Sequence, residues 1–366
     1  KRQILPALFL AIGSGNLNLP SSNLGLQEIT GVRGSTDINE IGEFNPSVRS
    51  IAAYKAESVI VNTLRLNGIL LAHTVPGGQL IAGQSSVVQL DAWNYEDAAY
   101  KTDMGMHFYM PSLLSRGRGF GGGRGFGGGA PAGDPIKEAL DKIESVKAIF
   151  REAKAYHQKG ADKQINLKLE ATKGLFNRTQ KLFVHCDQIK QMIVAIDFVK
   201  EFGFDVVVVG ASESWQIADL LKANNIAVIL TQEHSLPTTD DDDIDQPYKA
   251  ASVLQKAGVL FCLNDDDPQN RGRNLMFNAG TAAAYGLGKE GALQAITLNA
   301  AKILGVADKT GTLEVGKDAN IVISEGDILD MKSSIVTDAF IQGRAVAITS
   351  KHKQLYERYK HKYEIK

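Results

Sequence analysis

Short hydrophobic runs alternate with longer segments of helical periodicity through the middle and C-terminal parts of the chain. Runs such as Asp205–Gly210 (DVVVVG) and Ala227–Thr231 (AVILT) lack the period of two that marks a half-exposed strand. Such runs are typical of strands buried on both faces, and therefore of a parallel sheet covered by helices. Further strands are predicted at Gly68–Val75, Leu182–His185 and Gly258–Leu263.

Helical spacing fills the segments between these runs. Helices are predicted at Ile189–Phe202, at Ser214–Asn224 and after Asp134-Pro135, which supplies an N-cap followed by proline in the first turn. Repeated β–α units of this size form either a doubly wound sheet or a closed eight-stranded barrel. No GxGxxG motif opens a helix after the first strand, and no GxxxxGK[ST] motif occurs, so we favour the barrel.

Three compositional breaks interrupt the alternation. Arg116–Gly133 (RGRGFGGGRGFGGGAPAG) has few side chains to bury, and we interpret it as a flexible surface loop in preference to an RNA-binding RGG-like segment. Asp240–Asp245 (DDDDID) is interpreted as a surface loop or a loosely held cation site. The basic, aromatic tail repeats Leu355, Tyr359 and Tyr363 every four residues, which predicts a terminal amphipathic helix.

The composition is that of a globular protein, with 44% hydrophobic and 22% charged residues. Forty Lys and Arg nearly balance 41 Asp and Glu, so no net field favours nucleic acid or an acidic membrane. Cys186 and Cys262 are too few for a disulfide scaffold or a CxxC-type metal site. No stretch reaches the roughly 18 apolar residues that span a bilayer. Pro6 interrupts the apolar opening Lys1–Ile12, which we interpret as a strand rather than a signal peptide.

The C-terminal region carries a family resemblance. Ala292–Leu304 (ALQAITLNAAKIL), followed by Gly311–Val322 (GTLEVGKDANIV) and the segment IQGR at 341–344, resembles the C-terminal section of the amidohydrolase superfamily, near its imidazolonepropionase-like branch. Asn320 stands where the family has an aspartate. The similarity extends loosely back to about Leu5, so it covers most of the chain.

This resemblance implies a (β/α)8 TIM barrel with a small, partly incomplete β-sandwich module formed by the chain termini. We expect residues 1–20 to be a remnant of the N-terminal sandwich strands and the barrel entry. The barrel is then 21–304, with the Gly/Arg-rich loop at 116–133 inside it, the C-terminal sandwich part is 305–349, and a helix follows at 350–366. Most of the N-terminal sandwich half is missing, so we expect a truncated chain or a second chain that supplies it.

The resemblance also implies a metal site at the C-terminal ends of the barrel strands, where a bound water becomes a nucleophile and an aspartate moves its proton. We expect a divalent cation, with zinc the first candidate. The family's first-strand His-x-His pair is absent, with Ser21 and Asn23 in its place. His185 matches the fifth-strand histidine, Glu213 lies near the sixth-strand position, and Asp265 or Asp266 matches the catalytic aspartate.

Each assignment has a structural alternative. A histidine at a strand end, such as His185, is usually structural, and Glu213 can equally cap the next helix. Asp265–Asp267 can form a turn with an N-capping aspartate.

Further candidates come from the other histidines and from one glutamate. His73, His107 and His234 also fall on or just after predicted strands. With His185 they suggest either a rearranged metal site, in which His234 joins His185, or the ordinary polarity of a core. Glu170 is a weaker candidate for a carboxylate at the fourth strand.

The Gly/Ser-rich segment Gly77–Val88 is interpreted as a loop that either only shapes the barrel mouth or acts as a substrate loop, whose backbone N–H groups can bind an anion. It resembles a stretch of bacterial, often exported, amidohydrolase-like proteins, and this resemblance alone favours the periplasm or cell envelope.

Two functional hypotheses follow. The first is a metal-dependent hydrolase that cleaves a non-peptide C–N bond in a small molecule. The second is a catalytically inactive relative that keeps the barrel as a binding or assembly subunit. Neither includes a nucleic-acid partner or a membrane span, and both are compatible with a homo-oligomer or a second chain.

Overall fold

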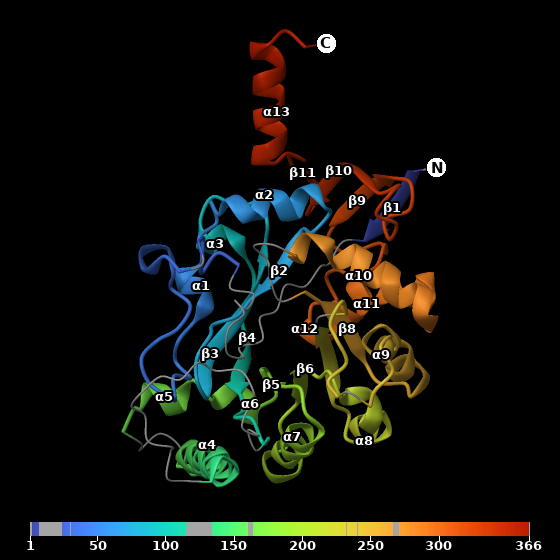
Figure 1. Cartoon of the computed structure of the whole chain (residues 1–366). Coiled ribbons are helices and arrows are strands. Elements are labelled where there is room, and N and C mark those ends of the chain that lie inside the picture. Colours follow the sequence, from blue (N-terminus) through green and yellow to red (C-terminus); the bar gives the residue numbers. More distant parts are fainter. Residues whose placement is uncertain are drawn as a thin grey trace, which may run out of the picture.

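The computed structural model of the chain describes residues 2–6, 24–29, 31–114, 134–159, 164–231, 233–239, 241–265 and 271–365. At its centre lies a curled seven-stranded sheet with the strand order β2-β3-β4-β5-β6-β7-β8 (Figure 1). Its strands are β2 (Leu71–Thr74), β3 (Ile81–Gln89), β4 (Ala99–Tyr109), β5 (Lys181–Cys186), β6 (Val206–Gly210), β7 (Ala227–Thr231) and β8 (Phe261–Asn264).

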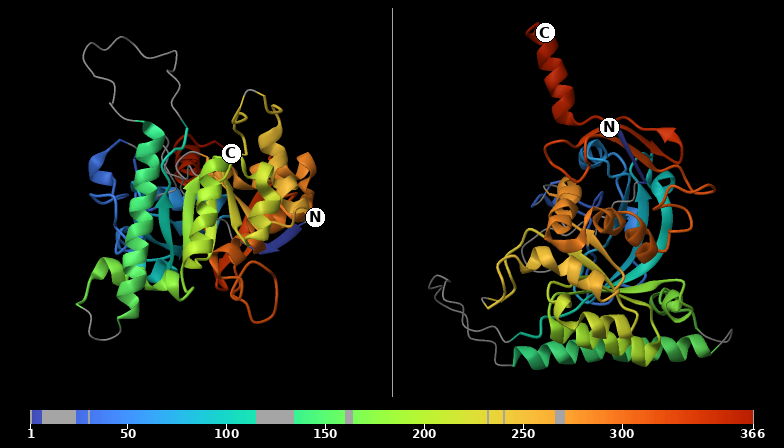
Figure 2. Two further views of the ribbon diagram at one scale, coloured as in Figure 1. Left: turned by 90° about the horizontal axis from the view of Figure 1, so that it is seen from below. Right: turned by 90° about the vertical axis from the view of Figure 1, so that its right-hand side faces the viewer.

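The second half of this sheet follows the predicted β–α alternation. Strands β4 to β8 pair in parallel, and β6 is buried along its whole length. The helices α7 (Ile189–Phe202), α8 (Ala218–Ala223) and α9 (Gln246–Lys256) lie along the outer face of these strands (Figure 2). The prediction of a parallel sheet covered by helices is confirmed for this half.

The first three strands depart from the (β/α)8 prediction. Strand β2 pairs antiparallel with β3, and β3 pairs antiparallel with β4. Parallel neighbours need a crossover of a dozen or more residues, and the connections at 75–80 and 90–98 are too short for one. The described residues therefore form a mixed α/β half-barrel of seven strands in place of a closed barrel of eight.

The segment Gly77–Val88 was predicted as a substrate loop, and that prediction is wrong for most of its length. Residues from Ile81 onward form β3, and every residue of β3 is buried. Backbone N–H groups that pair with β2 and β4 are not available to bind an anion.

Two apolar layers enclose the sheet. On the outer face, Val206 and Val208 of β6 pack in one cluster with Phe198 of α7. On the inner face, Val207 and Val209 belong to a second cluster that includes residues of the helix α12 (Leu298–Leu304). The helical residues of this inner cluster are Ala300, Ala301, Ile303 and Leu304. Helix α12 thus fills one end of the hollow that the curled strands enclose.

The long helix α4 (Pro135–Gln158) begins where the sequence predicts it. The Asp134 side chain accepts a hydrogen bond of 3.0 Å from the backbone N–H of Ile136, and Pro135 occupies the first turn. One face buries Ile143, Val146 and Phe150 against the rest of the molecule. This helix lies at the opposite end of the molecule from the C-terminal helix (Figures 1 and 2).

A second sheet joins the two ends of the chain. Its order is β1-β9-β10-β11, with β1 (Arg2–Pro6) antiparallel to β9 (Ile321–Glu325). The strands β10 (Ile335–Ile341) and β11 (Arg344–Ala345) complete it. A strand was predicted within Lys1–Ile12 and is confirmed at Arg2–Pro6. The described residues contain one terminal sheet, so the predicted sandwich is not confirmed.

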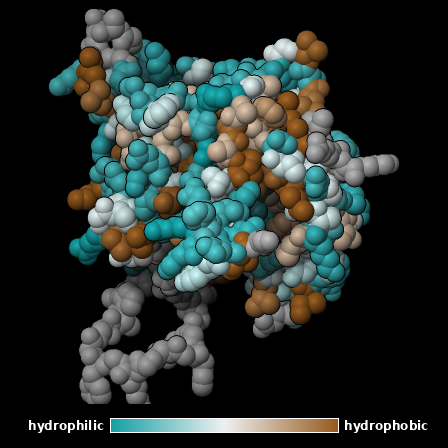
Figure 3. All heavy atoms as spheres, turned by 90° about the horizontal axis from the view of Figure 1, so that it is seen from above, coloured by the Kyte–Doolittle hydropathy of each residue, from teal (hydrophilic) through white to brown (hydrophobic). Residues whose placement is uncertain are grey.

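The C-terminal helix α13 (Lys351–Lys362) projects away from this terminal sheet and buries none of its residues (Figure 1). On the face seen from above, polar residues are interspersed with smaller groups of hydrophobic ones (Figure 3). Within the described ranges, no helix is long and apolar enough to cross a bilayer. The remaining helices are α1 (Ser50–Ala53), α2 (Val59–Leu66), α3 (Tyr95–Ala98), α5 (Leu167–Glu170), α6 (Lys173–Phe176), α10 (Leu275–Ala282) and α11 (Lys289–Ile296).

Candidate functional site

Three of the four strand histidines meet inside the half-barrel. His73 Nε2 lies 2.6 Å from Ser85 Oγ, and His107 Nε2 lies 2.7 Å from the same oxygen. His107 Nδ1 in turn lies 2.8 Å from His185 Nε2. The four residues come from the adjacent strands β2, β3, β4 and β5, which bring their side chains to one place.

Burial decides the charge of these histidines. His73 and His107 are fully buried and His185 is 5% exposed. Removal from water disfavours the charged ring, so burial lowers the pKa of His73 and that of His185 to about 3. Burial also lowers the pKa of His107, with a further contribution from His185 and His73 beside it. All three rings are therefore neutral near pH 7.

Aromatic neighbours fix the planes of two of these rings. Tyr109 stacks on His185 with ring centroids 4.0 Å apart and 15° between the planes. Phe183 stacks on His107 at 4.9 Å and 10°. The Tyr109 hydroxyl donates to the backbone oxygen of Pro76 at 3.0 Å, which holds Tyr109 in place. The ring of His185 is thereby held from its face as well as from its edge.

Asp265 follows β8 directly and is 5% exposed. Its Oδ2 accepts a hydrogen bond of 3.2 Å from Asn278 Nδ2, and its Oδ1 lies 3.8 Å from Arg271 Nε. Asn278 belongs to α10, so this helix orients the carboxylate. The other predicted aspartates, Asp266 and Asp267, lie outside the described residues.

Three predicted site residues have other contacts. His234 is exposed, and its Nε2 lies 2.9 Å from Thr281 Oγ1. Glu213 Oε2 accepts a hydrogen bond of 2.8 Å from the backbone N–H of Ile189, so Glu213 caps the preceding helix α7 rather than the next one. Glu170 was predicted at the end of a strand but ends the helix α5 and accepts from the Tyr156 hydroxyl at 2.7 Å.

Glu233 is a buried acid that the sequence pattern does not reveal. It follows β7 closely, is 2% exposed, and its Oε2 has no hydrogen-bond partner in the described part of the chain. Burial raises the pKa of this carboxyl well above its ordinary value. The neighbouring His234 was predicted because imidazole is a common metal ligand, whereas nothing in the local sequence indicates that Glu233 is buried.

The described residues do not form the implied metal centre. Among them, no group of three or more His, Cys, Asp and Glu side chains is placed to hold a metal ion. Both ring nitrogens of His107 and one of His185 are engaged in hydrogen bonds with each other or with Ser85. The departures Ser21 and Asn23, like the Gly/Arg-rich segment 116–133, lie outside the described residues.

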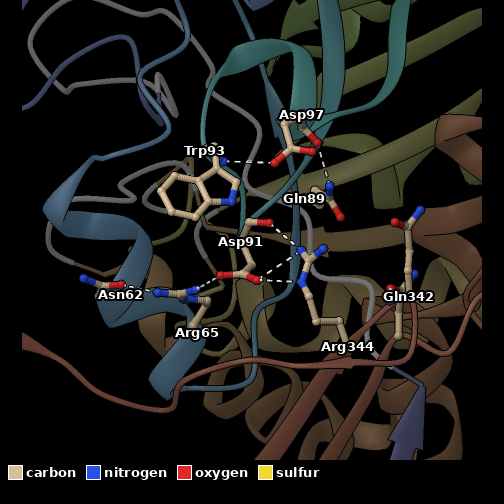
Figure 4. Close-up of polar contacts among 9 residues, drawn as sticks. Asn62, Arg65, Gln89, Asp91, Trp93, Asp97, Gln342 and Arg344 are labelled. Atoms are coloured by element: carbon tan, nitrogen blue, oxygen red, sulfur yellow. Dashed lines mark hydrogen bonds and ion pairs between the residues drawn. The ribbon is translucent and has the colours of Figure 1, made fainter.

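A second polar cluster connects the half-barrel to the terminal sheet (Figure 4). Asp91 pairs with Arg65 of α2 at 2.6 Å and with Arg344 of β11 at 3.0 Å. Trp93 stands beside them with 91% of its surface exposed, and its backbone N–H donates to Asp97 Oδ2 at 3.0 Å. The ion pairs of Asp91 join the end of β3 to α2 and β11, so we assign this cluster a structural role.

The parallel strands with a buried histidine and aspartate at their C-terminal ends define an α/β half-barrel protein of the TIM-barrel type. The chain belongs to the amidohydrolase family, because residues 141–346 match the model described as "Amidohydrolase family". Curated relatives that parts of the chain match are imidazolonepropionases.

The chain is similar to two curated relatives over part of its length and to a solved structure in its fold. An imidazolonepropionase of Thermoplasma volcanium is 43% identical over 86 residues, which cover 23% of this chain and 21% of that protein. An imidazolonepropionase of Picrophilus torridus is 29% identical over 205 residues, covering 53% of this chain and 48% of that protein. The matched region thus spans less than half of these curated relatives. An amidohydrolase structure from Thermotoga maritima MSB8 superposes with a TM-score of 0.76 at 23% identity, over 94% of this chain and 87% of that one.

Proposed function

We propose that this chain is a hydrolase of the amidohydrolase type that cleaves a non-peptide C–N bond in a small molecule. One observation carries the proposal. His185 lies near the end of β5 and Asp265 directly follows β8, so both stand at the C-terminal edge of the parallel strands, and both are almost completely buried. The family's chemistry lies at this edge.

The two side chains have complementary chemistry. Asp265 is oriented by Asn278 and has Arg271 within 4 Å, and a carboxylate held in this way can take a proton from water and deliver it to a leaving nitrogen. His185 is neutral because it is buried, so it contacts a substrate as a hydrogen-bond partner rather than as a cation.

The metal remains a prediction. In amidohydrolases a bound divalent cation supplies an activated water. Our predicted set for zinc is His185, His234, Glu213 and Asp266, of which the structure gives His234 and Glu213 other partners. We derive no step through a metal, since the described residues provide no group that fits one.

The proposal is tested by combining metal analysis with a hydrolysis screen on the purified chain. The screen covers cyclic amides, beginning with imidazolone rings, and linear amides. We expect turnover that Asp265→Asn lowers at least 100-fold, while the exposed control Asp219→Asn on α8 stays within twofold. Turnover that is equal in both variants, or absent for every compound, would overturn the proposal.

A second candidate function is a catalytically inactive binding or assembly subunit. The observation that favours it is that His185 is engaged by His107 and Tyr109, while no metal-holding group occurs in the described ranges. This candidate predicts a melting temperature that a chelator does not change and no hydrolysis of any compound. A second chain or a second copy would pair with the terminal sheet, and the mass in solution tests that association.

A further inference from the structure

An unbroken chain of hydrogen bonds crosses the interior from β2 to β5, and the proposed function uses only its last member. The links are His73 to Ser85 at 2.6 Å, Ser85 to His107 at 2.7 Å and His107 to His185 at 2.8 Å. At the two ends of this relay, His73 Nδ1 and His185 Nδ1 are buried and have no hydrogen-bond partner among the described residues.

Geometry limits how this relay can be protonated, because each ring is buried and its hydrogen bonds lead to Ser85 or to another ring rather than to a carboxylate that would balance a charge. A neutral imidazole carries one N–H and one lone pair, on different nitrogens. Each link needs one hydrogen and one lone pair, and Ser85 has a single hydroxyl proton. The direction in which Ser85 donates therefore fixes the tautomer of every ring in the relay.

Three arrangements satisfy these conditions. If Ser85 donates to His73, then His107 donates to Ser85 through Nε2 and must accept from His185 at Nδ1. If Ser85 donates to the backbone oxygen of Gly105, at 3.3 Å, both histidine neighbours donate to Ser85, and His107 again accepts from His185. Only if Ser85 donates to His107 is the direction reversed, so that His107 donates to His185.

The first two arrangements give His185 the same tautomer. Its proton lies on Nε2, where His107 accepts it, and its Nδ1 carries a lone pair. The reversed arrangement places a proton on His185 Nδ1, and the first arrangement places one on His73 Nδ1, where in each case no described group accepts it. The arrangement in which Ser85 donates to Gly105 leaves neither of these N–H groups unpaired, and it keeps the proton of His185 on Nε2. A buried N–H without an acceptor is rarer in folded proteins than a buried acceptor without a donor.

We propose that His73, Ser85 and His107 are positioning residues that hold His185 through Nε2–H and keep the lone pair of this ring on Nδ1, its ring nitrogen without a partner among the described residues. The inference rests on the proposed function in taking His185 as the functional residue. The stack of Tyr109 on His185 adds to the same restraint, because it prevents the ring from turning over.

The tautomers can be measured directly in protein labelled with ¹⁵N-histidine. Nitrogen chemical shifts separate a protonated ring nitrogen from a lone-pair nitrogen, and a His185→Gln spectrum assigns the resonances. We expect His185 to carry its proton on Nε2 in the wild-type protein. His107→Gln retains an acceptor oxygen and should preserve this tautomer.

His107→Phe is the matched variant that keeps a ring on Phe183 but removes the acceptor. We expect the Nε2–H proton of His185 to move upfield in this variant, because it loses its acceptor, and the Nε2–H proton of His107 to move upfield in Ser85→Ala for the same reason. His352→Gln, on the exposed helix α13, is the control and should change neither ring. Near-ultraviolet circular dichroism identifies variants that fail to fold. If His107→Phe is one of them, the wild-type and His107→Gln spectra still test the tautomer of His185.

A wild-type His185 that is protonated on Nδ1, or an Nε2–H proton of His185 that resonates at the same place in wild type and folded His107→Phe, would overturn the relay. This result is independent of turnover. If the tautomers are as expected and no compound is hydrolysed, the relay stands and the proposed function fails. If turnover depends on Asp265 and His185 is protonated on Nδ1, the relay fails and the proposed function stands.

Discussion

At the scale of single residues, Glu233 makes the stability of the folded protein depend on pH. Because the folded state raises the pKa of this carboxyl, the folded protein keeps the proton at pH values where the unfolded chain has lost it. Stability therefore falls as the pH rises above the ordinary glutamate pKa of about 4.3, by up to about 1.4 kcal/mol for each pH unit.

Glu233→Gln keeps the shape of the side chain without the ionisation. We expect the variant to be more stable than the wild type at pH 8 and equal to it near pH 4, as measured by urea unfolding at both values. Glu57→Gln, at an exposed position, is the control and should follow the wild type throughout. If the wild type is instead increasingly more stable than Glu233→Gln as the pH rises, the pKa of Glu233 is not raised in the folded state.

His73 has the opposite dependence. Its folded pKa is about 3, below the ordinary value of about 6.5, so the unfolded chain binds a proton in that window and the folded protein does not. The stability contributed by this group is present above pH 6.5 and is lost as the pH falls toward 3. His73→Gln should reduce the slope of unfolding free energy against pH, between pH 4 and 6, by up to about 1.4 kcal/mol per unit.

The measurement is a series of urea titrations in that range, with His361→Gln on α13 as the exposed control. The prediction is wrong if both variants keep the wild-type slope.

The sequence indicated three members of the relay because each histidine lies on a predicted strand. Ser85 was not predicted, since its place depends on how β3 pairs with β4, where it stands opposite Gly105. Register of an antiparallel pair depends on turn geometry and irregularities between the strands, and β3 and β4 shift register at several points.

At the scale of elements, α4 begins at a cap that can be removed without touching the core. Asp134 is exposed, and its side chain satisfies the N–H of Ile136. Asp134→Ala should lower the free energy of unfolding by about 1 kcal/mol, because an N–H at the helix start loses its acceptor. Thermal unfolding measures the loss, and Asp141→Ala, exposed within the same helix, is the control. Equal losses in the two variants would argue against a capping role.

Among the elements, hydrophobic periodicity predicts the buried strands and helices of the parallel half of the sheet. The bounds of α7 and β7 agree with the prediction, because an uninterrupted apolar run and a helical repeat each have a length that fixes the element. The antiparallel β2-β3-β4 unit was not predicted, because β2 and β3 are buried on both faces and look the same as parallel strands in sequence. Only the short connections distinguish the two.

At the scale of the molecule, Asp91 joins the two sheets. Arg65 is largely buried, so removal of the carboxylate leaves its guanidinium without this ion pair. Asp91→Ala should cost about 1 to 2 kcal/mol and increase hydrogen exchange in β10 and β11 relative to β6. The exposed pair of Glu144 with Arg151 supplies the control Glu144→Gln. Unchanged exchange in β10 and β11 would show that the sheets are held by other contacts.

The α/β class of the fold could be predicted from the sequence, but not that its central sheet stays open instead of closing into a barrel. Family resemblance indicated a barrel with a module formed by the chain ends, and the described residues give a half-barrel and one terminal sheet. The division at residues 20, 304 and 349 remains a prediction. Closure of a barrel depends on strand tilt and stagger, which leave no mark on hydrophobic periodicity.

Helix α12 has a consequence for how the chain reaches its native state. The hollow of the half-barrel is bounded by strands that are synthesised first, but Ile303 and Leu304 complete its apolar lining much later. Until residues 298–304 arrive, Val207 and Val209 have no helix to cover them. Nascent chains that end before this helix should therefore depend on chaperones, whereas those that include it have the apolar residues needed to exclude water from the interior.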